Sequence, residues 1–396
     1  MPPLIFRKGL DMKAAVAAEL AAEYHSALVD RIRAAGYTYT AGRLTLHLAR
    51  EFGFCYGVDR AVDYAYQARR RFGDRNIFLT GEIIHNPHVN ARLRANGIRF
   101  LTDPGESLDA VGPDDVVILP AFGVSVADML RLERTGCTLV DTTCGSVLNV
   151  WKNVRQYAAD GFTAVIHGKH RHEETRATAS QALVYPGGQY LVVLDRDEAA
   201  IVCDYIRHGG DREAFLARFR EACSPGFDPD RHLERIGCAN QTTMLMSESL
   251  AIEGMLREAM RDRYGEAELP RRFRAFDTIC SATEERQAAV VSLLDEHRLD
   301  LMIVVGGYNS SNTCNLARIC AGRTRTYHIA EPGCLVSASE IRYRPAGTAP
   351  AGRASEVVGR DWLPATGPVV VGLTAGASTP NNIVGEVIER LERFTR

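Results

Sequence analysis

Three cysteines stand in loops where an apolar, strand-like run gives way to a helical pattern: Cys55, Cys144 and Cys280. Two of them have nearly the same context, Asp141-Thr142-Thr143-Cys144 and Asp277-Thr278-Ile279-Cys280. The repeated context indicates a repeated module that delivers one thiolate at a time to a common centre. Because soft sulfur ligands select iron–sulfur clusters, zinc or copper(I), the pattern predicts a metal site.

Three cysteine ligands are one fewer than a cluster of the 4Fe–4S type normally takes. One iron would then keep an open position and could act as a Lewis acid toward a substrate oxygen. No Cys-x-x-Cys pair occurs, so any metal site must be assembled from distant segments. For the other cysteines we expect the commonest role of this residue, a small buried hydrophobe. They are Cys137, Cys203, Cys223, Cys238, Cys314, Cys320 and Cys334.

Two further loops have the composition of an anion site. Asn309-Ser310-Ser311-Asn312-Thr313 and Thr374-Ala375-Gly376-Ala377-Ser378 each follow a strand-like run and precede a helical pattern. Small hydroxyl and amide groups beside free helix N–H groups suit a phosphate or diphosphate. Taken singly, each loop is also typical of a helix cap. Their equivalent places in the repeat favour anion binding.

The densest ionisable cluster is the stretch 170–174, His-Arg-His-Glu-Glu. His172 and Glu174 could both reach a cavity from a loop that precedes a helix. A carboxylic acid near a reducing metal centre can donate a proton if desolvation raises its pKa. The alternative is a solvated charged turn. His85, just before Asn86-Pro87, could likewise donate to a phosphate or serve as a turn histidine.

The elements that would position these residues repeat one pattern: a short apolar strand, a polar loop and an amphipathic helix. Strands that alternate with helices of this length imply parallel sheets with crossover helices. In such sheets ligands sit beyond the carboxyl ends of the strands. The loops at His85, Phe122, His172, Thr242, Ser310 and Ser378 should then converge with the cysteine loops on one cavity.

We therefore predict an α/β fold of three pseudo-repeated lobes with mainly parallel sheets around a central iron–sulfur cluster. A helical N-terminal extension covers 1–43, with one helix over 12–35. The lobes cover 44–140 (completed by 367–396), 141–272 with a helical arm at about 195–235, and 273–366. A strand is expected over 273–280 and a solvent-exposed loop over 344–353.

The composition narrows the class of protein. The 396 residues are 46% hydrophobic and 24% charged, and the net charge of −2 gives no basic excess for nucleic acid. No apolar run reaches the roughly 18 residues of a membrane span, so we expect no membrane partner. The N-terminus lacks a signal-peptide core, and ten cysteines without one indicate a reducing compartment. A cytoplasmic location is expected, or the plastid stroma for a plant or algal source.

From about residue 44 onward the chain resembles the 4-hydroxy-3-methylbut-2-enyl diphosphate reductase family, in its longer plant and cyanobacterial branch. The resemblance rests on motifs that occur in the family's order. They are Gly53-Phe54-Cys55-Tyr56-Gly57-Val58, Ile84-His85-Asn86, Asp141-Thr142-Thr143-Cys144, His172-Glu173-Glu174-Thr175, Asn240-Gln241-Thr242-Thr243, Thr278-Ile279-Cys280-Ser281-Ala282-Thr283, Asn309-Ser310-Ser311-Asn312 and Thr374-Ala375-Gly376-Ala377-Ser378.

The resemblance implies the terminal reductase of the methylerythritol phosphate route to isoprenoids. It implies one 4Fe–4S cluster held by Cys55, Cys144 and Cys280, and an allylic diphosphate substrate whose hydroxyl is removed as water. The implied proton donor is Glu174, with Thr242 and His172 in the same cavity. The implied diphosphate ligands are His85, His172, Ser310, Ser311, Asn312 and Ser378. A ferredoxin or flavodoxin would supply electrons, and a homodimer is kept as an option.

Two positions depart from the family pattern. Short bacterial members of the family carry a diphosphate-facing histidine at the position of Phe122. The longer branch has phenylalanine there, as this chain does. One phosphate contact is then lost or supplied by another group, for which His88 is a candidate. Gly145 follows Cys144 where proline is usual, which loosens the loop without removing a ligand.

The reductase has three rivals: a hydro-lyase with a three-cysteine cluster, a non-catalytic iron–sulfur sensor and a zinc protein. Metal content separates the reductase from the zinc protein. We expect anaerobically purified protein to contain iron and sulfide and to give a paramagnetic resonance signal on reduction. Stoichiometric zinc without iron would exclude the cluster.

Overall fold

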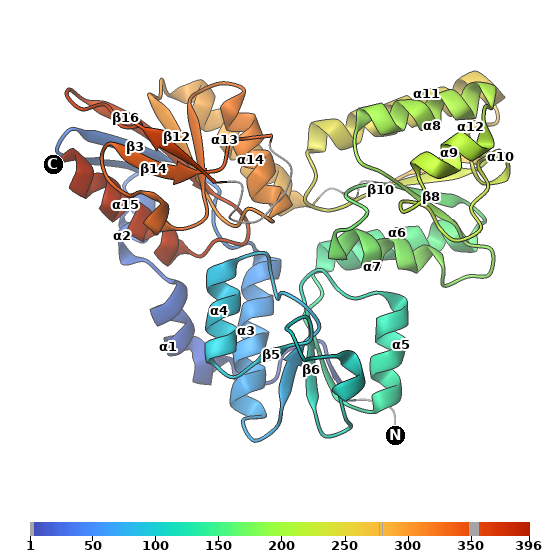
Figure 1. Ribbon diagram of the computed structural model, residues 1–396, viewed down its shortest axis with the longest axis horizontal. Helices are drawn as coiled ribbons and strands as arrows, with labels where there is room; N and C mark the ends of the chain where they lie inside the picture. Colours follow the sequence, from blue (N-terminus) through green and yellow to red (C-terminus); the bar gives the residue numbers. More distant parts are fainter. Residues whose placement is uncertain (1–3, 277, 279, 348–355) are drawn as a thin grey trace. The chain divides into compact units, whose positions relative to one another are not determined.

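The computed structural model describes residues 4–276, 278, 280–347 and 356–396 (Figure 1). Backbone contacts divide the chain into two compact units. Unit 1 consists of Pro104–Cys280 with the N-terminal residues up to Ile5, and unit 2 consists of Phe6–Asp103 and Ser281–Arg396. The last boundary along the chain thus falls directly after Cys280. The predicted limits of the three lobes remain a prediction.

Strands and helices alternate through both units. The described elements of unit 1 are η1 (Leu108–Ala110), β6 (Val116–Leu119), α5 (Val126–Thr135), β7 (Thr138–Asp141), α6 (Gly145–Ala159), β8 (Thr163–His167), α7 (Glu173–Ala182), β9 (Tyr190–Val193), α8 (Arg196–His208), α9 (Arg212–Arg218), α10 (Pro229–His232), β10 (Ile236–Asn240), α11 (Met246–Tyr264), α12 (Leu269–Arg272) and β11 (Phe273–Ala275). Strand β1 (Ile5–Phe6) falls at the first boundary.

The described elements of unit 2 come from both ends of the chain. They are α1 (Lys13–Tyr24), α2 (Ala27–Ala34), β2 (Thr38–Ala41), β3 (Leu44–Leu48), α3 (Tyr56–Arg71), β4 (Ile77–Leu79), α4 (Pro87–Ala95), β5 (Arg99–Phe100), α13 (Ser281–Glu296), β12 (Leu301–Val305), α14 (Ser311–Ala321), β13 (Thr326–Ile329), η2 (Pro332–Cys334), β14 (Glu340–Tyr343), β15 (Val357–Arg360), β16 (Val369–Ala375) and α15 (Asn381–Thr395).

A parallel sheet with the strand order β11-β10-β8-β9 forms the centre of unit 1. Helices α6 and α7 lie on one face of this sheet, and α8 and α11 lie on the other (Figure 1). Because both faces are covered, every residue of β8 and β10 is buried. The register places His167, the last residue of β8, opposite Asn240, the last residue of β10. The loops that follow these strands therefore emerge side by side.

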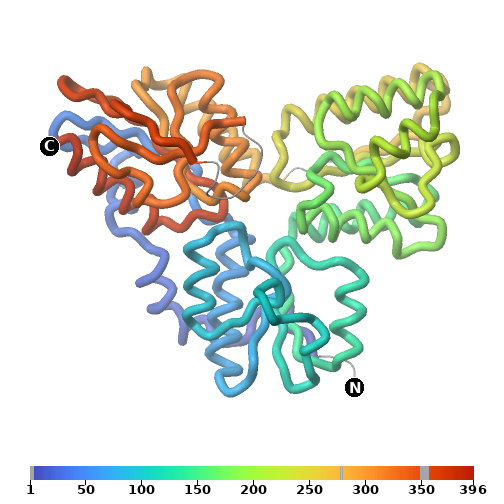
Figure 2. The backbone as a smooth tube through the Cα atoms, in the orientation of Figure 1, coloured from blue at the N-terminus to red at the C-terminus, as the bar shows by residue number. Residues whose placement is uncertain are grey.

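The sheet of unit 2 has the order β13-β12-β16-β3-β2, and only β2 runs antiparallel to its neighbour. Strand β3, near the start of the chain, lies beside β16, near its end, as the adjoining blue and red segments of Figure 2 show. Successive side chains of β12 lie on opposite faces of the sheet and pack in two different hydrophobic cores. Ile303 packs in the core that contains α2 and α15, and Met302 packs against α13 and α14. Each such buried side chain contributes roughly 1.5–3 kcal/mol to the free energy of unfolding.

The predicted α/β class with mainly parallel sheets is confirmed. Segment 195–235 is helical as predicted, and its helices contribute Val202, Phe215 and Phe219 to the core of unit 1. No helix in the described ranges is both long and apolar enough to cross a membrane.

Several predicted bounds are wrong. The single helix over 12–35 is two helices, because the Ser26 hydroxyl accepts a hydrogen bond from the N–H of Val29 (3.3 Å) and starts α2 anew. The strand over 273–280 ends at Ala275; Asp277 and Ile279 lie outside the described residues. So does 348–353 of the predicted loop, and its first residue, Arg344, is buried rather than exposed.

The burial of His47, whose ring stacks on that of His297, predicts that unit 2 is sensitive to acid. Their centroids are 3.7 Å apart, and burial, with a smaller effect of His297, lowers the pKa of His47. The folded state therefore binds fewer protons than the unfolded chain, and stability falls as pH drops below the ordinary histidine pKa of about 6.5. We expect His47→Gln to reduce the loss of Tm between pH 7.5 and 5.5. The exposed His208→Gln is the control, and an unchanged Tm difference in His47→Gln would refute the assignment.

Candidate active site

The three loop cysteines occupy the same place in the strand–loop–helix pattern. Cys55 and Cys144 are the N-cap residues of α3 and α6, and Cys280 directly precedes α13. Each thiol is partly exposed, and none of the ten cysteines forms a disulfide. The positive end of a helix dipole favours a negative group at this position. The arrangement suits thiolate ligands.

Backbone hydrogen bonds fix the Cys55 loop to the end of β16. The N–H of Cys55 donates to the carbonyl of Ala377 (3.2 Å), and the N–H of Gly53 donates to that of Ala375 (3.3 Å). Gly53 has a positive φ of 78°, and a Cβ there would lie 2.7 Å from Oδ1 of Asn381. Only glycine fits without strain at this turn.

The Cys144 loop is tied to the loop after β6. The N–H of Cys144 donates to the carbonyl of Ala121 (3.0 Å), and Oδ1 of Asp141 accepts from the N–H of Thr143 (3.1 Å). Near Cys280, the hydroxyl of Thr278 donates to Oδ1 of Asn240. The Asp-Thr-x-Cys repeat thus precedes a helix at both of its occurrences.

Most of the other cysteines fit the predicted core role. Cys137, Cys203, Cys238, Cys320 and Cys334 are buried. Burial raises the pKa of Cys203 to about 11 and that of Cys320 to about 12, so these thiols stay protonated near neutral pH. The prediction is wrong for Cys223 and Cys314, which are partly exposed.

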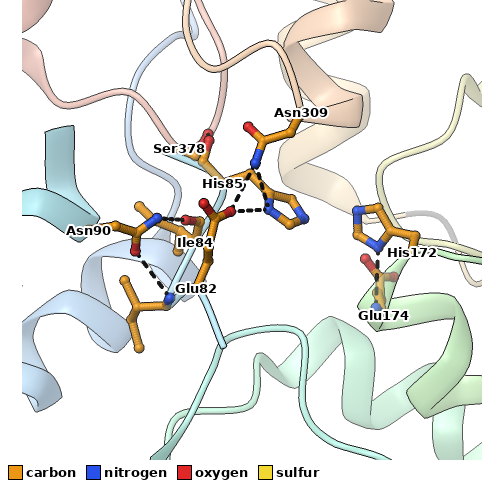
Figure 3. Close-up of polar contacts among 9 residues, drawn as sticks. Glu82, Ile84, His85, Asn90, His172, Glu174, Asn309 and Ser378 are labelled. Carbon is orange, nitrogen blue, oxygen red and sulfur yellow. Dashed lines mark hydrogen bonds and ion pairs between the residues drawn. The ribbon is translucent and has the colours of Figure 1, made fainter. Parts of the chain in front are cut away.

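Glu174, His172 and Thr242 meet in unit 1 beyond β8 and β10. The buried carboxylate of Glu174 accepts a hydrogen bond from the backbone N–H of Thr242. The N–H of Glu174 donates to Nδ1 of His172 (3.2 Å), which caps α7 (Figure 3). Gln241 stabilises the same corner, since its Oε1 accepts from Thr175 Oγ1 (3.1 Å). The structure brings these side chains together, and their catalytic roles stay predictions.

Phe122, which stands where short members of the family have a histidine, contacts the ring of His172. The two rings pack edge to face, with centroids 5.6 Å apart and an interplanar angle of 81°. Phe122 therefore limits the orientations that the His172 ring can take. The proposed substitute, His88, packs edge-on against Tyr24, and burial followed by the charge of Arg92 lowers its pKa. Nε2 of His88 is buried without a partner among the described residues, and its phosphate role stays a prediction.

The predicted anion-binding residues of unit 2 converge from three loops. Ser310 caps α14, Asn312 Oδ1 accepts from the N–H of Ala377 (2.9 Å), and Ser378 Oγ donates to the carbonyl of His85 (3.2 Å). The side chains of Ser310, Ser311, Asn312 and Ser378 are all buried. Nδ2 of Asn312 is buried and has no hydrogen-bond partner among the described residues. Such an unsatisfied amide lowers the free energy of unfolding unless a ligand accepts its hydrogen bonds.

Two residues that the sequence reasoning did not single out hold the ring of His85. Glu82 Oε2 lies 2.8 Å from Nδ1 of His85, and Nδ2 of Asn309 donates to the same carboxylate oxygen (2.9 Å; Figure 3). Because Glu82 engages Nδ1, Nε2 is the nitrogen that would meet a phosphate oxygen. Asn309 stands in the motif that contains Ser310, whereas Glu82 lies two positions before the motif Ile84-His85-Asn86.

Two glycines let these loops approach closely. A Cβ on Gly307 would lie 2.7 Å from the carbonyl oxygen of His85, and a Cβ on Gly376 would lie 1.9 Å from Oγ1 of Thr313. Larger residues would push the loops apart.

The predicted site residues fall into two sets. Cys55, His85, Ser310, Ser311, Asn312 and Ser378 belong to unit 2, and Cys144, His172, Glu174, Thr242 and Cys280 belong to unit 1. A common cavity for the two sets remains a prediction.

Fold and site together define an α/β protein that presents cysteines and predicted anion-binding groups beyond its parallel strands. The family model described as LytB protein matches residues 46–392. A 4-hydroxy-3-methylbut-2-enyl diphosphate reductase of Gloeobacter violaceus is 51% identical over 394 residues, which cover 98% of this chain and 91% of that protein. A protein of the same name from Thermosynechococcus vestitus is 47% identical over 388 residues, covering 97% and 93%. The chain belongs to the LytB family, as the motifs predicted.

Two solved structures are similar to this chain. The structure of (E)-4-hydroxy-3-methyl-but-2-enyl diphosphate reductase, titled the terminal enzyme of the non-mevalonate pathway, has a TM-score of 0.54 and 26% identity, and the match covers 88% of this chain and 99% of that one. The Plasmodium falciparum reductase structure has a TM-score of 0.60, with 87% and 86% covered. At 21% identity this second likeness shows the fold alone.

Replacing Asn312 tests the anion site without the full reaction. Asn312→Asp keeps the oxygen that accepts from Ala377 but exchanges an amide donor for a negative charge. We expect the affinity for inorganic pyrophosphate, measured by calorimetry, to fall about tenfold or more, since hydrogen bonds to charged groups contribute about 1.5–3 kcal/mol. Asn149→Asp, exposed on α6, is the matched control. Equal affinities in the two variants would contradict the site.

Proposed function

We propose that the chain reduces 4-hydroxy-3-methylbut-2-enyl diphosphate to isopentenyl and dimethylallyl diphosphate in isoprenoid biosynthesis. The observation that carries this proposal is 51% identity over nearly the full length to a protein named as that reductase. In the balanced reaction, two electrons and two protons replace the allylic hydroxyl by hydrogen and release water.

The donor set fits one 4Fe–4S cluster, held by Cys55, Cys144 and Cys280. These thiols stand at helix N-termini, are partly exposed and are not oxidised to disulfides, whereas most of the other cysteines are buried. When bound, such a cluster supplies electrons and an open iron that can polarise a carbon–oxygen bond.

The diphosphate is held by unit 2 in this proposal. The N–H groups at the start of α14 and the hydroxyls of Ser310, Ser311 and Ser378 are the proposed donors for phosphate oxygens. Asn312 contributes its unpartnered amide, and His85 contributes Nε2. Fixed donors hold the charged end so that the allylic end has one orientation.

Glu174 is the proposed proton donor for the departing hydroxyl. Burial disfavours the charged form of a carboxyl group, and the N–H of Thr242 holds one oxygen in place. His172 and Thr242 would hold the substrate against Glu174, and the edge of Phe122 orients His172.

A one-electron protein carrier, ferredoxin or flavodoxin, is the proposed reductant. The free cysteines are compatible with a reducing compartment, and the cytoplasmic or stromal location and a homodimer stay predictions.

Glu174→Gln separates proton donation from cluster assembly. We expect the variant to bind as much iron as the wild type and to lose roughly 10²–10⁴-fold of its turnover, the usual contribution of a general acid. The measurement is anaerobic turnover with a chemical reductant, beside iron content. The exposed Glu234→Gln should behave as wild type.

Unchanged turnover in Glu174→Gln would refute its role. Wild-type turnover without any reductant would instead favour a hydro-lyase, and an iron-loaded protein without turnover would favour a sensor.

A further inference from the structure

A buried arginine with no assigned role contacts the loop of the first cysteine. Arg286 lies on α13 and is 3% exposed. Its Nε and Nη2 donate to the carbonyl oxygen of Gly53 (3.2 and 2.9 Å), and Nη2 also donates to that of Phe54 (3.2 Å). Nη1 donates to the carbonyl of Ala282 within the helix (2.8 Å).

These acceptors are the two residues that directly precede Cys55. Helix α13 in turn begins at Ser281, the residue that follows Cys280. One rigid guanidinium fork therefore connects the Cys55 loop to the helix that continues from Cys280. A planar fork can hold two successive carbonyls in a fixed geometry, which a single ammonium cannot do.

The charge of Arg286 has no counter-charge among the described side chains. No ion pair between described residues includes Arg286, and the acidic residues beside it on the helix, Glu284 and Glu285, are exposed. Carbonyl groups satisfy the N–H donors but carry no net charge. A buried cation without an anionic partner is costly, so a negative group is expected nearby.

We propose that Arg286 is a positioning residue for the cluster. It holds the Cys55 loop in the conformation that binds iron, and its positive charge offsets the negative charge of the thiolate-ligated cluster. This inference rests on the proposed function, because it needs Cys55 to be a ligand.

Two measurable effects follow. Loss of the hydrogen bonds should let the Cys55 loop open, so a chelator should remove iron faster. Loss of the positive charge should disfavour the added electron, so the midpoint potential of the cluster should become more negative.

The test compares Arg286→Gln, Arg286→Lys and the wild type, all loaded with cluster anaerobically. Arg286→Gln should lose iron to a chelator several-fold faster than wild type and show a more negative midpoint potential in a spectroscopic redox titration. Arg286→Lys keeps the charge but not the fork, so it should lose iron faster at a potential near that of wild type. The exposed Arg298→Gln removes the same charge just beyond α13 and should match the wild type in both measurements.

Wild-type values of both quantities in a folded Arg286→Gln protein would overturn the proposal. So would a potential in Arg298→Gln shifted as far as in Arg286→Gln. If Arg286→Gln does not fold, Arg286→Lys decides alone, and wild-type chelation kinetics in that variant would overturn the proposal. A wild-type protein that takes up no iron–sulfur cluster would contradict the proposed function instead, whatever the variants do.

Discussion

The site depends on one constraint of parallel sheets: every strand ends at the same edge, and a helix starts just beyond it. The first N–H groups of that helix have no partner within the helix, so the edge collects unpaired donors and positive dipole ends. This chain places its chemistry there. Cys55 and Cys144 cap helices, Ser310 caps α14, and His172 caps α7. Thiolates, phosphates and carboxylates are all anions that such ends stabilise.

The elements that carry this chemistry could be predicted because their patterns are local. The residue patterns over 44–48 and 126–135 predict a strand and a helix, and β3 and α5 have these bounds. The cysteine and serine loops fall between strand and helix as expected. Strands β9 and β13 were not predicted from the sequence. The break between α1 and α2 was missed because Ser26 competes with a helical pattern that continues on both sides.

Contacts across long sequence separations could not be predicted. Glu82 and Asn309 are 227 positions apart, and Arg286 and Gly53 are 233 apart. No periodicity records such a pair, since only the folded sheet brings the loops together. Arg344 illustrates the same limit: its surroundings have the composition of an exposed loop, yet its guanidinium donates to the carbonyl of Tyr308 in the core of unit 2.

The order of strands in unit 2 has a consequence for synthesis on the ribosome. Unit 1 consists of one nearly continuous stretch of chain. In unit 2, by contrast, β3 lies between β2 and β16, which are far apart in the sequence and are therefore synthesised at different times. Domains fold as units once their chain is available. Pro104–Cys280 can therefore become compact while β3 still lacks its partner strand β16. The backbone partners of the Cys55 loop, Ala375 and Ala377, are made more than 300 residues later, so the loop reaches its final form only after they are made.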